Sequence, residues 1–151
     1  MKLSTRGDYA VRALVELTGL PGEDTLPLPE LAERTGIPRR YLEQLLGSLS
    51  TAGIVTARRG ATGGYRLKRP ADEITVGEVI RAMDGPLAPT RCASRTQHAP
   101  CPAYRCPDES TCALRDMWVD VRDAISAIVD HTTFRDLAAR RKVSTSLHYA
   151  I

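Results

Sequence analysis

The sequence predicts a mainly α-helical protein with one small β-hairpin, because three patterns follow one another along its 151 residues. Several short segments repeat apolar residues every three or four positions, as amphipathic helices do. Two β-competent runs then flank a glycine-rich turn. A longer segment near the end carries apolar residues seven apart. With 42% apolar and 26% charged residues, the composition is that of an ordinary globular protein and excludes disorder, collagen and a membrane span.

The sequence of residues 8–53 predicts three helices. A helix over 8–20 is followed by a short helix over 29–35 that ends at Gly36, a residue typical of helix C-terminal caps. Pro38 opens another short helix, which runs to Gly53. Two short helices joined by a turn that contains glycine form a helix-turn-helix, whose second helix enters the major groove of DNA.

A β-hairpin is predicted directly after the second short helix. Residues 54–58 and 64–68 are β-competent runs on either side of the glycine-rich turn 59–63. A helix-turn-helix followed by such a basic hairpin is a winged helix-turn-helix. Arg58 and Arg59 lie at the tip, where arginine suits a phosphate or the negative potential of a narrow minor groove.

Basic residues are concentrated in this same part of the chain. Eight of them lie from Arg34 to Arg69 against the single acidic residue Glu43, although the whole chain has a net charge of only +3. A basic block in a nearly neutral chain indicates a surface that faces a polyanion. The sequence contains no recognisable catalytic constellation, and no glycine-rich phosphate-binding motif follows a strand. It therefore predicts a DNA-binding protein and not an enzyme.

The long helix predicted over 111–131 has an apolar stripe along its whole length. Leu114, Val121 and Ile128 lie seven apart, and an adjacent row adds Trp118 and Ile125. Little of the small domain remains to cover such a stripe, which favours a partner helix in a homodimer. The alternative is that the stripe packs back on its own subunit.

The chain divides into segments at the places where periodicity changes. A helix over 74–84 starts with a capping box formed by Thr75 and Glu78. Periodicity is then lost from residue 87 to residue 110, which indicates a functional loop. We expect a winged helix-turn-helix domain (1–85), a cysteine-rich loop (86–112), a dimerisation helix with a short final helix (111–139) and a basic, then irregular tail (140–151).

The N-terminal sequence indicates the cellular compartment, and the compartment bears on the chemistry of the four cysteines. Asp8, Arg12 and Glu16 interrupt the apolar residues there, so a secretory signal is not expected and the protein is predicted to be cytoplasmic. Clustered thiols in the cytosol bind metal or sense redox state more often than they form disulfides. The cysteines are Cys92, Cys101, Cys106 and Cys112.

Five sequence motifs resemble a known family in the same order. They are MKLSTRGDYAVRA from Met1, YLEQLL from Tyr41, RGATGGY from Arg59, ITVGEVI from Ile74 and CALRDMW from Cys112. Over Met1 to Leu137 the chain resembles the Rrf2 family of bacterial transcription regulators, which includes IscR, NsrR and CymR. The resemblance implies a winged-helix DNA-binding domain, a long dimerisation helix and, in many members, an iron-sulfur cluster held by three cysteines in the loop before that helix.

The resemblance also implies which residues read DNA. Arg39, Arg40, Tyr41, Glu43 and Gln44 match the recognition helix, and Arg59 matches a residue of the wing. Glutamine can pair with adenine, glutamate can accept from cytosine, and arginine can bind guanine or phosphate. Alternatives remain at two positions: the ring of Tyr41 covers the core, or Glu43 forms a surface salt bridge with one of its arginine neighbours.

The cysteine spacing lacks the paired knuckles of a zinc ribbon, whereas thiolates at irregular spacings can hold an iron-sulfur cluster. The resemblance implies that Cys106 and Cys112 are the last two ligands, with either Cys92 or Cys101 as the first. A 2Fe-2S cluster is slightly favoured over a 4Fe-4S cluster.

A fourth ligand is less clear, because Arg115 stands where IscR-like members have a histidine, and arginine cannot bind iron. The extra cysteine is one substitute. Asp8 is another, since an acidic residue at this position reaches the cluster from the opposite subunit in NsrR-like members. The alternative for Asp8 is an ordinary acid in the first helical turn. His98 is a minor candidate.

These observations predict a dimeric DNA-binding transcription regulator, expected to be a repressor that binds a palindromic operator. It would sense redox state, nitric oxide or iron-sulfur status through a cysteine-ligated cluster. The alternative is a metal-free or zinc-containing thiol-based regulator of the CymR kind.

Overall fold

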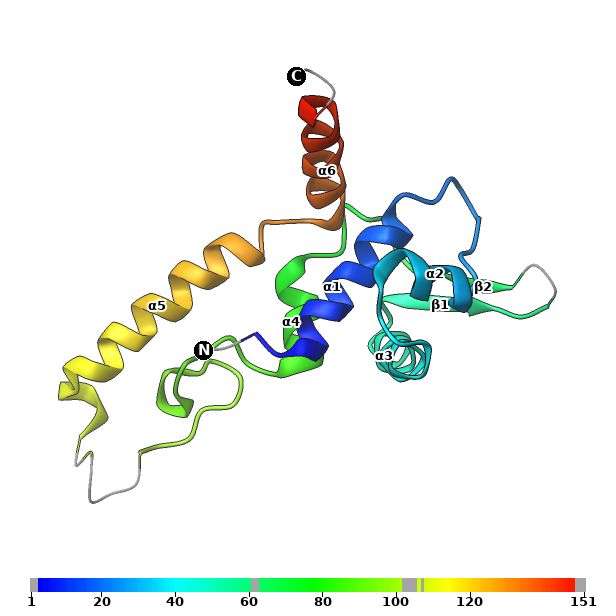
Figure 1. Cartoon of the computed structure of the whole chain (residues 1–151). Coiled ribbons are helices and arrows are strands. Elements are labelled where there is room, and N and C mark those ends of the chain that lie inside the picture. The colour runs from blue at the N-terminus through cyan, green and yellow to red at the C-terminus, as the bar shows by residue number, and fades with distance from the viewer. Residues whose placement is uncertain (1–2, 61–62, 102–105, 107, 149–151) are drawn as a thin grey trace.

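Three helices form the N-terminal part of the protein in the computed structural model, which describes residues 3–60, 63–101, 106 and 108–148, with side chains through residue 141. Helix α1 (Thr5–Thr18) lies against α2 (Leu28–Thr35) and α3 (Arg39–Thr51), as Figure 1 shows. Gly36 ends α2 with a left-handed φ of 68°, which residues with a Cβ atom rarely adopt. The predicted helix-turn-helix is confirmed.

Helix α1 begins at Thr5, three residues before the predicted start at residue 8. The hydroxyl of Ser4 caps the helix, because it accepts a hydrogen bond from the Gly7 N–H at 3.0 Å. The Ser4 N–H in turn donates to the carboxylate of Asp84 at 3.0 Å. The start of α1 is thus fixed by a residue 80 positions away, which local sequence patterns do not reveal.

The predicted hairpin consists of β1 (Val55–Arg58) and β2 (Gly64–Leu67). The strands are antiparallel, and Val55 lies opposite Leu67. Val55 is buried while β1 becomes exposed towards its end, so the hairpin is anchored at its base and the residues 58–60 face solvent. The fold is therefore mainly helical with one small hairpin, as predicted.

Helix α4 (Val76–Asp84) starts at the predicted cap, where the hydroxyl of Thr75 accepts from the Glu78 N–H at 3.2 Å. The Glu78 side chain bonds to Arg69. Near the other end of α4, the Arg81 guanidinium donates to both carboxylate oxygens of Asp130, at 2.5 and 2.8 Å. This bidentate pair ties α4 to the end of α5 and lowers the pKa of Asp130 below its ordinary value.

Helix α6 (Phe134–His148) returns to the N-terminal part of the chain. Phe134 is completely buried in the core formed by α1, α3 and α4, so residues beyond the predicted boundary at 85 complete this domain. The prediction of a short final helix and an irregular tail from residue 140 is wrong, because α6 continues to His148. Its sequence contains no glycine or proline that would end it earlier.

Helix α5 (Ala113–Val129) extends away from the rest of the chain (Figure 1). It is shorter at both ends than the predicted 111–131. None of its side chains is buried, and Leu114, Met117 and Ile128 are 60%, 43% and 68% exposed. Of the five residues of the predicted stripe, Leu114 and Ile128 are exposed, whereas Trp118, Val121 and Ile125 are half-buried. The alternative of packing back on the same subunit therefore does not hold for Leu114 and Ile128, and Met117 adds a third exposed apolar side chain. A row of this length is unfavourable in water unless another surface covers it.

Candidate DNA-facing surface and cysteine loop

The start of helix α3 presents polar side chains to solvent. Its buried face is apolar and consists of Leu42, Leu45, Leu46 and Leu49. The predicted readers Arg39, Arg40, Glu43 and Gln44 are exposed on the other side. No ion pair joins Glu43 to either arginine within the described residues, so the salt-bridge alternative is not observed. The side chains of this helix are therefore placed where a major groove could receive them.

Tyr41 occupies a different position from its neighbours on α3. Its ring is half-buried and packs edge to face on Tyr9 of α1, with ring centroids 5.7 Å apart and an interplanar angle of 85°. This is the arrangement expected if the ring covers the core. A direct base contact by the ring is therefore less suited to this fold than a supporting role.

Arg6 belongs to the same surface, although sequence reasoning did not select it. Its guanidinium donates to the Ser48 hydroxyl at 2.8 Å, which fixes a cation from α1 beside the recognition helix. Arg6 lines a surface hollow of about 310 Å³ together with Tyr41, Gln44, Leu45 and Ser48. The only local signal was its place in the MKLSTRGDYAVRA motif, because the contact with α3 is tertiary.

The wing carries the two arginines predicted for its tip. Arg58 ends β1, Arg59 follows it, and both are exposed. The Gly63 N–H donates to the Gly60 carbonyl at 2.9 Å and closes the turn. The rest of the predicted turn, residues 61–62, lies outside the described residues. Exposed arginines beside a tight turn suit contact with a phosphate backbone.

The cysteine loop begins with the 3-10 turn η1 (Arg91–Ala93). Cys92 in this turn is buried, and its Sγ lies 3.9 Å from the Sγ of the half-buried Cys101. The thiol–thiol contact is the largest of the causes that raise the pKa of Cys101. The first two cysteines thus form a close pair.

The other two cysteines flank the second 3-10 turn, η2 (Glu109–Thr111). Cys112 is the N-cap residue of α5, and Cys106 packs against the turn through the Asp108 carbonyl, 3.8 Å from its Sγ. Burial and contact with the Cys112 thiol raise the pKa of Cys106 to about 11. A raised thiol pKa favours the protonated form, whereas metal binding requires the thiolate.

The donor set of the loop suits iron-sulfur chemistry, because such clusters are held by thiolates. Within the described residues, however, no group of three or more histidine, cysteine, aspartate or glutamate side chains is arranged to hold a metal ion. Successive thiols of the loop nevertheless contact one another: Cys92 with Cys101, Cys101 with Cys106 and Cys106 with Cys112.

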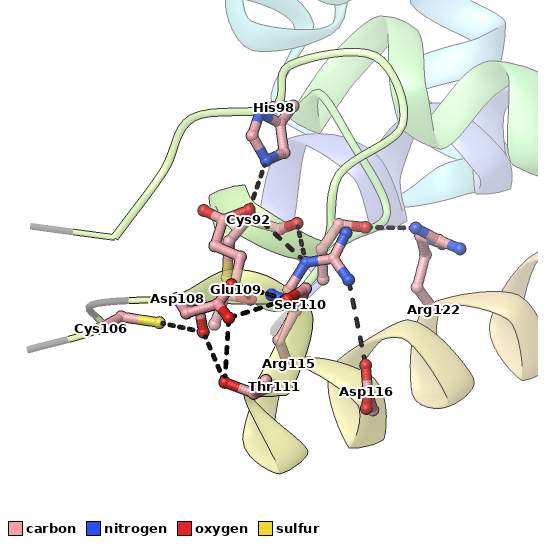
Figure 2. Close-up of polar contacts among 12 residues, drawn as sticks. Cys92, His98, Cys106, Asp108, Glu109, Ser110, Thr111, Arg115, Asp116 and Arg122 are labelled. Atoms are coloured by element: carbon pink, nitrogen blue, oxygen red, sulfur yellow. Dashed lines mark hydrogen bonds and ion pairs between the residues drawn. The ribbon is translucent and has the colours of Figure 1, made fainter.

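Two arginines of α5 hold the η1 turn. The Arg115 Nε donates to the Cys92 carbonyl at 3.2 Å, and the Arg122 guanidinium donates to the Ala93 carbonyl at 2.5 Å. Figure 2 shows both side chains reaching from α5 towards this turn. Arg115, which replaces the histidine of IscR-like members, thus supports the backbone beside the first cysteine.

Glu109 is a polar centre of the loop that sequence reasoning missed. Its Oε2 lies 2.9 Å from His98 Nε2 and 3.6 Å from Arg115 Nε (Figure 2). The hydrogen bond with His98 lowers the pKa of Glu109. His98, a minor ligand candidate, is therefore engaged by a carboxylate. No sequence signal marked Glu109, because its partners lie 11 residues before it and 6 after it.

Asp8, the proposed ligand from the opposite subunit, is paired within its own helix. Its carboxylate accepts from Arg12 at 2.8 Å, in an i,i+4 ion pair. This arrangement matches the alternative of an ordinary acid in the first helical turn. A role towards a partner subunit stays a prediction, because the structure describes one chain.

A helix-turn-helix followed by a basic wing defines a DNA-binding transcription regulator of the winged-helix class. The chain belongs to the Rrf2 family: residues 3–140 match the family model described as "Iron-dependent Transcriptional regulator". It is 37% identical over 139 residues to the transcriptional regulator CymR of Bacillus subtilis, covering 92% of this chain and 91% of that protein. It is also 36% identical over 143 residues to the transcriptional regulator IscR of Aliivibrio salmonicida, covering 95% and 80%.

Solved structures support the same assignment. The structure of CymR, described as the global cysteine regulator of B. subtilis, matches with a TM-score of 0.75 and 35% identity, over 93% of this chain and 98% of that one. In the described part of the chain, no helix is both long and apolar enough to cross a membrane. The named relatives are transcriptional regulators.

Proposed function

We propose that the protein is a cytoplasmic, homodimeric repressor whose affinity for a palindromic operator depends on its cysteine loop. The observation that carries this proposal is the attachment of the loop to α5 through Arg115 and Arg122. The same helix has the open apolar row that a second copy would cover. A change in the loop would therefore act on the helix that sets the distance between two DNA-binding domains.

The DNA contacts divide between two elements. Arg39, Arg40, Glu43 and Gln44 would read base edges in the major groove, and Arg58 and Arg59 would contact phosphates or the minor groove. Tyr41 and Arg6 would support this surface from the side of α1. In a two-fold symmetric dimer, the recognition helices bind half-sites about 34 Å apart, one turn of DNA.

Cys92, Cys101, Cys106 and Cys112 would hold an iron-sulfur cluster, with 2Fe-2S slightly favoured over 4Fe-4S. Asp8 of the partner subunit would be a further, weak ligand. A bound cluster supplies a group that responds to oxidants and nitric oxide. The chain's part is to keep Cys92 on η1 and Cys112 at the start of α5, so that a change in the ligands moves both.

A metal-free or zinc-containing thiol-based regulator is the second candidate. The similarity to CymR favours it. Within the described residues, no group of three or more histidine, cysteine, aspartate or glutamate side chains is arranged to hold a metal ion, which also favours it. In this candidate, oxidation of the thiols themselves would replace the cluster as the signal.

Metal analysis separates the two candidates. The full-length protein would be purified without oxygen and analysed for iron, acid-labile sulfide and visible absorbance. Iron and sulfide in equal amounts would support the cluster, whereas zinc alone or no metal after reconstitution would support the thiol-based regulator. The affinity of loaded and metal-free protein for its operator would then be compared, and equal affinities would exclude a cluster-dependent switch.

Asp8→Asn tests the ligand from the partner subunit. If Asp8 binds the cluster, this variant lowers iron retention and changes the visible spectrum. Arg12→Ala is the matched control, because it breaks the ion pair within α1 and leaves the carboxylate in place. Unchanged spectra in both variants would remove Asp8 from the ligand set.

A further inference from the structure

The start of the cysteine loop is folded so that two thiols face each other. The Ala99 N–H donates to the Arg91 carbonyl at 3.4 Å, which brings the chain back to the η1 turn. Two residues further on, the Sγ of Cys101 lies 3.9 Å from the Sγ of Cys92. Closing such a short segment with a covalent bond costs little additional chain entropy.

The two thiols differ in their access to solvent. Cys92 is only 6% exposed, and the Thr90 hydroxyl lies 3.4 Å from its Sγ. Cys101 is half-buried and therefore the more accessible of the pair. An oxidant would reach Cys101 first. Cys92, whose Sγ lies 3.9 Å away, and Cys106 both contact Cys101 and could react with the product.

The chain has one more cysteine than the ligands that the family resemblance implies. The family resemblance calls for three cysteine ligands, and the chain has four. When no cluster is bound, neither member of the pair is a ligand, so both thiols can react with each other.

We infer that Cys92 and Cys101 form a reversible disulfide when a peroxide reaches the cluster-free protein. The Cys101 thiolate attacks hydrogen peroxide to give a sulfenic acid and hydroxide, which takes up the proton that the thiol had released. The Cys92 thiol then displaces water from the sulfenic acid, and the S–S bond forms. In total, two thiols and one peroxide give one disulfide and two waters. A thiol reductant reduces the disulfide and restores both thiols.

The disulfide would act on the loop through contacts already present. Arg115 and Arg122 hold the carbonyls of Cys92 and Ala93 to α5, so the bond would attach the Cys101 segment to the same helix. It would also remove both thiols from any ligand set. This second consequence rests on the proposed cluster-binding function, whereas formation of the disulfide does not.

The positions of arginine make the bond easy to detect by tryptic digestion and mass spectrometry. Trypsin would release Cys92 in the peptide 92–95 and Cys101 in the peptide 96–105, whereas Cys106 and Cys112 share the peptide 106–115. The cluster-free, full-length protein would be treated with hydrogen peroxide at about pH 8.5, where thiolate is more abundant. We expect the linked pair 92–95 and 96–105, and its loss after treatment with a thiol reductant.

The same digestion of cysteine-to-serine variants would show which two sulfurs are joined. Cys101→Ser and Cys92→Ser should each abolish the linked pair, and Cys106→Ser should retain it. The inference is overturned if peroxide instead joins Cys106 to Cys112 within the peptide 106–115, or oxidises Cys101 without linking it to Cys92.

Iron loading separates this inference from the proposed function. Reduced protein should accept iron and sulfide, and peroxide-treated protein should accept less than a tenth as much until it is reduced again. Loading of the disulfide form to the same level would overturn its effect on the ligand set. Failure of the reduced protein to load would refute the cluster proposal, while the peptide result would still decide whether the disulfide forms.

Discussion

Among single residues, the basic side chains between Arg34 and Arg69 fall into two groups. Three are bound by carboxylates within the chain: Arg34 by Glu30, Arg66 by Glu23 and Arg69 by Glu78. The others have no ion pair within the described residues and include all four arginines predicted to contact DNA. The basic surface is therefore smaller than the sequence count indicates, and it is concentrated on α3 and the wing.

Arg59 is the clearest test of this surface. Arg59→Ala should weaken operator binding about 10-fold and reduce the salt dependence by about one counterion, because one phosphate contact is lost. Affinity would be measured by fluorescence anisotropy at several salt concentrations. Arg135→Ala is the control, because Arg135 lies on α6 and pairs with Asp72. Equal losses in the two variants would show that only net charge matters.

A second prediction at this scale compares two helical glycines. A Cβ atom at Gly77 would collide with the Asp130 carboxylate, which Arg81 holds in place. Gly77→Ala should therefore destabilise the fold by about 1–3 kcal/mol, the usual cost of overpacking. At Gly47 nothing lies within 4 Å of such an atom. Gly47→Ala should instead stabilise helix α3 by about 0.5–1 kcal/mol.

Urea unfolding of both glycine variants would give the two free energies of unfolding. The changes in the free energy of unfolding should have opposite signs, because the substitution is the same and only the surroundings of the two glycines differ. A stable Gly77→Ala variant would mean that Asp130 can move aside without losing its pair with Arg81.

Among the helices and strands, those whose ends are set by neighbouring residues could be predicted from the sequence. Helices α2 and α3 and the hairpin are delimited by Gly36, Pro38 and the glycine-rich turn, so neighbouring residues determine them. The place of α6 was not predictable, because Phe134 enters the core through contacts with Ile74 and α1 that are distant in sequence.

The cysteine loop shows the same limit for the candidate site. Its spacing indicated thiol chemistry, yet the spacing alone could not show which sulfurs are adjacent. The 3.9 Å contact between Cys92 and Cys101 depends on how the loop folds back. The roles of Arg115 and Glu109 could not be predicted either, since both depend on partners brought together by the tertiary fold.

Attachment of the loop to α5 can be tested at Arg122, whose side chain is only 12% exposed. Arg122→Met keeps much of the apolar stem but leaves the Ala93 carbonyl without this donor. We expect a loss of about 1–3 kcal/mol in stability and faster amide hydrogen exchange over residues 91–99. Arg122 also pairs with Asp123. Arg95→Met is the control, because Arg95 binds the same carboxylate but is 70% exposed. Unchanged exchange in Arg122→Met would mean that the loop is held by other contacts.

At the scale of the whole molecule, two sides of helix α5 carry side chains of different kinds. One side carries Arg115 and Arg122, which bind the cysteine loop. The other carries the exposed apolar row of Leu114, Met117 and Ile128. Because both sides belong to one helix, the proposed dimer interface and the state of the loop would be mechanically connected. The pair between Arg81 and Asp130 then links the end of α5 to α4 and so to the DNA-binding domain.

Dimerisation through the apolar row is the prediction on which this connection depends. Ile128→Lys places a charge in the proposed interface of both subunits, so we expect the dimer dissociation constant to rise at least ~100-fold. Ala127→Lys is the matched control, because the neighbouring residue is exposed on another face of α5 and introduces the same charge. Sedimentation equilibrium would measure both variants. If Ile128→Lys remained a dimer while keeping its fold, the apolar row could not be the interface, and α5 could not transmit the state of the loop between two recognition helices.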